Sequence, residues 1–221
     1  MTLVLSAAGL GKRFADGRGD RQVLADLNLD VRRGEIVALL GPSGSGKTTL
    51  LNLAAGLLDA DAGQLWLHDE NGRHELSALD VRRRARLRRA RVGYVFQFFN
   101  LVPTLTVREN VLLPLQLNRR PDLVGRALGR LQALGMAPHL DAFPEALSGG
   151  ERQRTAIARA LAHEPLLVLA DEPTGNLDAD NAVRVVTLLW QEVRALDSAL
   201  LVATHDERIA SQADRILRFG R

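Results

Sequence analysis

The stretch Gly41-Pro42-Ser43-Gly44-Ser45-Gly46-Lys47-Thr48 restricts what this chain can fold into more than any other. It matches the pattern G-x-x-x-x-G-K-[ST], in which glycines allow a tight loop and backbone N–H groups point at phosphate oxygens. Lys47 would reach the β- and γ-phosphates, and the hydroxyl of Thr48 would bind Mg²⁺. A chance match has odds of about one in a thousand for so specific a pattern. The sequence therefore predicts a nucleotide site, which Thr49 would join.

The residues on both sides of this loop fit its role. Residues 35–40 are a short apolar run that predicts a buried strand, and residues 47–58 predict a helix. The N-terminus of that helix would present the positive end of its dipole to the phosphates.

Composition narrows the class of protein only moderately. The chain has 221 residues, enough for one well-packed core, and no apolar run of about 18 residues that predicts a membrane span. We expect the apolar residues 1–10 to be a first strand and not a signal peptide. The absence of cysteine excludes disulfides and suits a reducing cytoplasm. The net charge is only +3, and the high pI reflects arginine, so charge gives little support for nucleic-acid binding.

The pattern along the chain predicts strands that alternate with helices. Asn71-Gly72 signals a hairpin turn, and Thr106 with Glu109 has the spacing of a capping box. We expect strands at 2–6, 23–31, 35–40, 64–68, 91–97, 166–170 and 199–204, and helices from 106 and at 122–134, 151–162 and 179–196. This alternation indicates an α/β fold, here one domain over 1–221 with a mainly helical subdomain inserted at about 98–162.

A second part of the expected site follows the apolar strand at 166–170. That strand ends in Asp171, which is the arrangement that directs a carboxylate at Mg²⁺ in nucleotide hydrolases. Glu172 comes next, and a carboxylate there can polarise an attacking water.

Leu147-Ser148-Gly149-Gly150-Glu151 is a loop that precedes a helix, and it completes a set of motifs. With the phosphate-binding loop, Gln97, the 171–172 pair, Asn176-Leu177-Asp178 and His205 in order, the whole chain resembles ATP-binding cassette (ABC) ATPases. The resemblance implies a RecA-like core, an N-terminal antiparallel β subdomain and the inserted helical subdomain.

The same resemblance implies how the site works. ATP with Mg²⁺ would be hydrolysed to ADP and phosphate, with Lys47 at the phosphates and Glu172 as general base. Gln97 and His205 would position the water, and Thr48, Gln97 and Asp171 would hold the metal. Two chains would pair head to tail, so that the residues Ser148, Gly149, Gly150 and Asp178 join the nucleotide site. We expect the other histidines, His68, His74, His139 and His163, to be surface residues.

Two positions depart from the commonest family pattern. Glu151 stands where glutamine is more usual, and we expect little effect because the loop donors precede it. Phe14 stands where the adenine-stacking residue is often tyrosine, and it keeps the aromatic face without the hydroxyl. The alternative for Phe14 is a core packing residue.

The segments around Gln97 and 147–178 look most similar to the lipoprotein-release, macrolide-export and cell-division ATPases of bacteria. That branch implies an integral membrane subunit as partner, a homodimer of the ATPase, a peripheral location on the cytoplasmic face of the cell membrane, and no nucleic acid. The alternatives are a soluble ABC ATPase that acts on DNA or ribosomes, and a small-molecule kinase.

Two further segments have open interpretations. Residues 82–91 are rich in arginine, which indicates either a solvated helix face or a surface for anionic lipid or nucleic acid. The apolar residues of 98–105, interrupted by Pro103, either pack in the helical subdomain or form the groove for a short helix of the membrane subunit, as the resemblance implies; the residues are Phe98, Phe99, Leu101, Val102 and Leu105.

Overall fold

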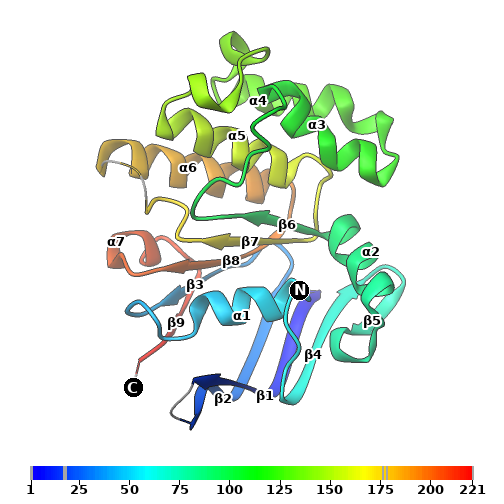
Figure 1. Cartoon of the computed structure of the whole chain (residues 1–221), viewed down its shortest axis with the longest axis vertical. Coiled ribbons are helices and arrows are strands. Elements are labelled where there is room, and N and C mark those ends of the chain that lie inside the picture. Colours follow the sequence, from blue (N-terminus) through cyan, green and yellow to red (C-terminus); the bar gives the residue numbers. More distant parts are fainter. Residues whose placement is uncertain (1, 17–18, 176, 178, 221) are drawn as a thin grey trace.

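The computed structural model describes residues 2–16, 19–175, 177 and 179–220. It contains two sheets with helices around them (Figure 1). The antiparallel sheet has the order β2-β1-β4-β5, with β1 (Leu3–Asp16), β2 (Gly19–Arg32), β4 (Ala62–Asp69) and β5 (Gly72–Glu75). The parallel sheet has the order β6-β7-β8-β3-β9, with β6 (Val92–Val95), β7 (Leu167–Asp171), β8 (Ala199–Thr204), β3 (Ile36–Leu40) and β9 (Arg215–Arg218).

The helices lie on both faces of the parallel sheet. Figure 1 shows α1 between the two sheets, α6 and α5 on the opposite side of the parallel sheet, and α3 and α4 beyond them. Their bounds are α1 (Lys47–Ala54), α2 (Val81–Arg91), α3 (Val107–Asn118), α4 (Val124–Ala133), α5 (Gly149–Leu161), α6 (Ala179–Ala195) and α7 (Glu207–Ala210). Short 3₁₀ turns cover Leu76–Ala78, Pro121–Leu123, Ala137–His139 and Pro144–Ala146.

The central strands are apolar throughout because both faces of the parallel sheet are covered. Along β3, Ile36, Ala38 and Leu40 pack with the helices α3 to α6, whereas Val37 and Leu39 pack with α1 and the antiparallel sheet. Strand side chains alternate between faces, so one five-residue strand supports two cores. The predicted α/β class is thus confirmed.

Several predicted boundaries were wrong, and local chemistry explains them. Helix α1 ends at Ala54 instead of 58, because Gly56 follows with a left-handed φ of 62°. Strand β1 runs to Asp16 instead of ending at 6, because its second half pairs with β2 through irregularities around Gly9. The edge strand β9 was missed because its exposed arginines hide the apolar pair between them. The hairpin turn at Asn71-Gly72 is confirmed by the pairing of β4 with β5.

The close approach of β6 to α5 generates a stability prediction. A Cβ on Gly93 would lie 2.3 Å from the backbone oxygen of Ala160, which cannot move without distorting α5. We expect Gly93→Ala to lower the free energy of unfolding by about 1–3 kcal/mol. Gly125→Ala is the control, because a Cβ there meets nothing within 4 Å and alanine favours the helix α4. Urea denaturation of both variants measures the difference, and equal stability would contradict the packing argument.

Candidate nucleotide-binding and hydrolysis site

The phosphate-binding loop connects β3 to α1 and depends on its glycines. Gly44 and Gly46 have φ of 76° and 102°, in the left-handed region that other residues rarely adopt. A Cβ on Gly46 would also lie 2.9 Å from Cγ1 of Val23, and one on Gly41 would lie 2.1 Å from the backbone oxygen of Phe219. The loop therefore requires glycine for both conformation and space.

Lys47 is the first residue of α1 and is only 5% exposed. Its Nζ donates to the backbone oxygens of Gly41 at 2.7 Å and Pro42 at 3.0 Å. It also lies 3.7 Å from Oε1 of Glu172. The loop's own carbonyls thus hold the ammonium group inside the loop, so its position is set before any phosphate arrives.

Thr48 and Asp171 meet at the base of the site. Oγ1 of Thr48 donates to Oδ1 of Asp171 at 3.0 Å, across a sequence separation of 123 residues. Burial raises the pKa of the Asp171 carboxyl above its usual value, and the Thr48 hydrogen bond opposes this effect. A buried carboxylate beside a hydroxyl is a set of hard oxygen ligands that suits Mg²⁺.

Glu172 has a backbone conformation that is unusual for its residue type. Its φ is 44°, and its N–H donates to the backbone oxygen of Ala203 at 3.0 Å. One side-chain oxygen, Oε1, faces Lys47, and the other lies 2.9 Å from Nδ1 of His205. The left-handed backbone directs this carboxylate between a buried cation and an exposed imidazole.

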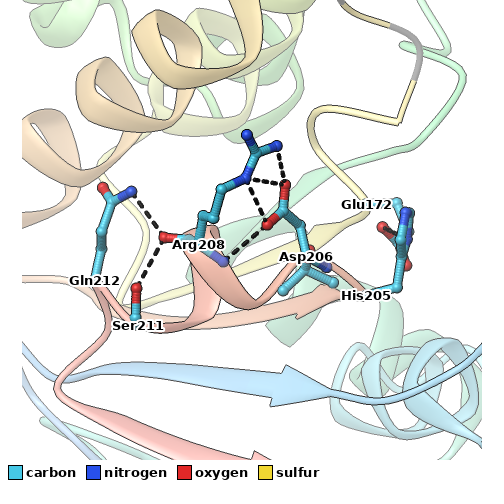
Figure 2. A network of polar contacts seen from close by, with 7 residues as sticks. Glu172, His205, Asp206, Arg208, Ser211 and Gln212 are labelled. Carbon is cyan, nitrogen blue, oxygen red and sulfur yellow. Dashed lines mark hydrogen bonds and ion pairs between the residues drawn. The ribbon is translucent and has the colours of Figure 1, made fainter. Parts of the chain in front are cut away.

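The turn that carries His205 is fixed from both sides (Figure 2). The N–H of Asp206 donates to the hydroxyl of the buried Thr204 at 3.0 Å. Asp206 caps α7, and the guanidinium of Arg208 donates to its carboxylate, which lowers the pKa of Asp206. The imidazole of His205 itself stays 65% exposed. A firm turn thus presents a side chain that a bound molecule can still reach.

One cavity of about 300 Å³ joins these groups. Its lining residues are Phe14, Arg21, Val23, Ser43, Gly44, Gly46, Lys47, Thr48, Thr49, Gln97, Glu172 and His205. Phe14 is 39% exposed at the cavity, with Nζ of Lys12 5.4 Å from its ring centre, so it is not a core residue. A Cβ on Gly175 would lie 3.5 Å from Nε2 of Gln97 and 3.6 Å from Cβ of Glu172, so the amide lies near the glutamate.

Arg21 and Val23 are lining residues that sequence reasoning missed. Arg21 pairs with Phe14 across β1 and β2, and its guanidinium donates to the backbone oxygen of Gly44 at 3.2 Å. No sequence motif marks either residue, since their position follows from strand pairing. The partial signal was Phe14, because a residue opposite it on β2 must face the same side of the sheet.

Several predicted residues are not among those that line the cavity. Gly41 and Pro42 supply the carbonyls that hold Lys47, and Ser45 lies in the loop with its hydroxyl buried. Ser148, Gly149 and Gly150 begin α5 and are not among the residues that line the cavity. Asp178, like Asn176, lies outside the described residues.

Ser148 and Glu151 form a capping box at the start of α5. The carboxylate of Glu151 accepts from both the N–H and the hydroxyl of Ser148 at 2.8 Å, and these bonds lower its pKa. Nε2 of His139 lies 3.2 Å from the same carboxylate. The departure at Glu151 therefore has a local role, since it fixes the turn that carries Ser148.

His163 corrects one expectation, since it is buried and not a surface residue. It is 7% exposed, and its Nε2 lies 3.2 Å from the backbone oxygen of Val92. Burial lowers the pKa of His163 to about 4, so the imidazole is neutral near pH 7. Across residues 2–16, 19–175, 177 and 179–220, no group of three or more His, Cys, Asp or Glu side chains forms a metal site by itself.

These features define an ATPase of the ABC class, and comparisons with known proteins agree. The family model for ABC transporters matches residues 24–175, more than half of the chain, so the chain belongs to the ABC transporter ATP-binding family. It is 45% identical over 218 residues to an uncharacterized ABC transporter ATP-binding protein of Mycobacterium tuberculosis, across 97% of this chain and 86% of that protein. It is also 45% identical over 216 residues to the lipoprotein-releasing system ATP-binding protein LolD of Pseudomonas fluorescens, across 97% and 93% of the two chains.

Solved structures give the same answer for the fold. The chain matches the dimeric structure of MJ0796, a bacterial ABC transporter cassette, with a TM-score of 0.85 and 34% identity over 97% of this chain and 94% of that one. A post-hydrolysis state of that cassette with ADP and Pi matches with a TM-score of 0.84 and 33% identity over the same shares. The predicted family, fold, ATPase activity and use of ATP with Mg²⁺ are confirmed, and the chain is a motor subunit for a membrane transporter.

Proposed function

We propose that two copies of this chain act on a separate integral membrane subunit, at the cytoplasmic face of the membrane, in a complex of the lipoprotein-release type. The identity to LolD proteins, 46% for that of Pseudomonas syringae, supports this branch. No helix in the described part of the chain is long and apolar enough to cross a bilayer. One observation carries the proposal that two copies act together. Ser148, Gly149 and Gly150, which the family resemblance assigns to the nucleotide site, are not among the residues that line the cavity, so a second chain would supply them.

In the proposed reaction each side chain of the site has one task. Lys47 neutralises charge on the transferred phosphoryl group, because the loop carbonyls of Gly41 and Pro42 already hold its ammonium inside the loop. Thr48, Asp171 and Gln97 would hold Mg²⁺, which would neutralise charge at the phosphates. Glu172 takes the proton of the attacking water. His205, whose Nδ1 lies 2.9 Å from the carboxylate of Glu172, positions that water.

The removal of one charge tests the role of Glu172. Glu172→Gln keeps the shape of the side chain, so ATP should still bind, while hydrolysis should fall by about 10²–10⁴-fold because the base is lost. Phosphate release and ATP binding measured on the purified variant separate the two effects. Near-normal turnover would refute the assignment of Glu172 as base.

The proposed dimer completes the site from a second chain. The first turn of α5 has backbone N–H groups without acceptors inside the helix, as at every helix N-terminus. The capping box of Ser148 and Glu151 fixes the direction in which that turn points. In a head-to-tail pair these backbone donors face the γ-phosphate held by the loop of the other chain.

Mixing two inactive chains tests this arrangement. Ser148→Arg leaves the phosphate-binding loop intact, and Lys47→Ala leaves the start of α5 intact. Each variant alone should be inactive, but a mixture should regain part of the activity, because one of the two sites then combines two intact halves. If mixed dimers form, as measured by tagged pull-down, and no activity returns at any ratio, the head-to-tail site is excluded.

A groove beside β6 is the proposed seat of the membrane subunit. The cavity there has a volume of about 260 Å³ and lies among β6, α3 and α5. Its apolar lining includes Tyr94, Phe96, Leu113 and Leu117, and Leu117 is 53% exposed. Phe98 nearby in the chain is 70% exposed, whereas the other apolar residues of 98–105 are half-buried. Exposed apolar groups around a groove suit an amphipathic helix.

Arg159 of α5 connects this groove to the segment that follows Gln97. Its guanidinium donates to the backbone oxygens of Phe99 at 2.8 Å and Asn100 at 2.5 Å. Both of these residues have left-handed φ, so the segment after Gln97 takes its shape against α5. A helix seated in the groove would thus contact a half-buried cation that holds the segment after Gln97 against α5.

A matched pair of surface variants tests the docking groove. Leu117→Arg puts a charge in the groove and should abolish co-purification with the membrane subunit, while ATP binding and the melting temperature change little. Leu57→Arg is the control, since Leu57 is 47% exposed and does not line this groove. Equal assembly of both variants would mean that the docking surface lies elsewhere, and unfolding of Leu117→Arg would show a packing role.

A further inference from the structure

The arginines of α2 divide into two groups. Four of them serve the fold: Arg84 pairs with Asp59, Arg88 donates to the carbonyls of Ala55 and Gly56 after α1, Arg89 donates to Asn118, and Arg91 pairs with Asp69 and Glu70. Arg84, Arg88 and Arg91 lie on the side of α2 that faces the rest of the fold, whereas Arg89 is exposed; no residue of α2 is fully buried.

The other arginines face solvent. Within the described residues, the guanidinium groups of Arg82 and Arg86 make no hydrogen bond or ion pair, and both side chains are exposed. Arg83 has only a 3.4 Å ion pair with Asp80, in which both side chains are more than half exposed. Arg82 and Arg86 are four residues apart, so they lie on one stripe of the helix, and Arg89 continues this stripe toward α3 with its guanidinium bonded to Asn118. A solvated helix that needed only solubility would alternate charges, whereas this stripe is entirely cationic.

An exposed apolar side chain and a cavity lie next to the arginine stripe. Val81, directly before Arg82, is 79% exposed. A cavity of about 440 Å³ between α2 and the β4–β5 hairpin is lined in part by Arg83, Arg86 and Leu87. Clusters of exposed basic residues attract anionic lipid headgroups, and the exposed Val81 can lie against the same headgroup layer.

Contacts with α3 place α2 beside the groove that we propose for the membrane subunit. The side-chain amide of Asn118, at the end of α3, donates to the backbone oxygen of Arg89 at 2.8 Å and accepts from its guanidinium at 3.3 Å. Helix α3 supplies Leu117 to the groove described above, and Arg89 lines the same groove. The stripe is therefore continuous with the proposed seat of the membrane subunit.

We propose that Arg82, Arg83 and Arg86 of α2 bind the phosphate groups of anionic phospholipids beside the membrane subunit. The contact is electrostatic and needs no bound nucleotide. It rests on the proposed function only for the orientation of the chain on the membrane, because the cationic surface belongs to the chain by itself.

Vesicle co-sedimentation of the purified chain tests this proposal. Wild-type chain should bind vesicles of phosphatidylcholine mixed with phosphatidylglycerol, and bind those of phosphatidylcholine alone much more weakly. The double variant Arg82→Gln with Arg86→Gln should lose about 10- to 30-fold in apparent affinity, because each basic residue near the surface contributes roughly fivefold. Its ATPase activity and melting temperature should not change.

Two control variants decide the outcome. Arg126→Gln with Arg184→Gln removes the same charge from exposed sites on α4 and α6, and should keep vesicle binding. Arg82→Lys with Arg86→Lys retains the charge and should also bind. Equal losses in both glutamine variants, no loss in the α2 variant, or equal binding of wild type to both vesicles would overturn the proposal. No membrane subunit is present in this assay, so its result is independent of the groove test.

Discussion

The register of three parallel strands governs the position of the site. Leu40 of β3 pairs with Thr204 of β8, and Asp171 of β7 pairs with Ala203 of the same strand. Parallel strands end at one edge of the sheet, so the phosphate-binding loop, the two carboxylates and His205 all emerge there. A slip of one residue in either pairing would turn a functional side chain into the core. The apolar runs of β3, β7 and β8 are thus a condition for the chemistry as well as for stability.

The sequence motifs predicted the local backbone at this edge of the sheet, because the residues of each motif also determine its conformation. The glycines of the loop predict positive φ, and Gly44 and Gly46 have it. The apolar run before Asp171 predicts a buried strand that ends at the carboxylate, as β7 does. Such local patterns contain the information that sets backbone shape, so single-sequence reasoning succeeds where the shape and the chemistry share the same residues.

The missed features all depend on contacts between distant segments. Arg21 reaches the cavity because β1 and β2 pair far beyond the predicted length of β1. His163 has a polar side chain, yet it is buried beside β6, where its Nε2 lies 3.2 Å from the backbone oxygen of Val92. The arrangement of Arg159 with Phe99 and Asn100 has no local signature at either end. Strand pairing and burial of this kind are set by the fold as a whole, and a pattern along the chain does not contain them.

The backbone of Glu172 has a further meaning for the evolution of this protein. A left-handed conformation costs a non-glycine residue about 1–2 kcal/mol, and at φ 44° this glutamate bears that cost permanently. Glycine would relieve this backbone strain, yet it would remove the carboxylate that lies between Lys47 and His205. Laboratory selection for heat resistance alone would therefore not protect this side chain from substitution. Any stabilised lineage of the protein needs a simultaneous selection for turnover to retain it.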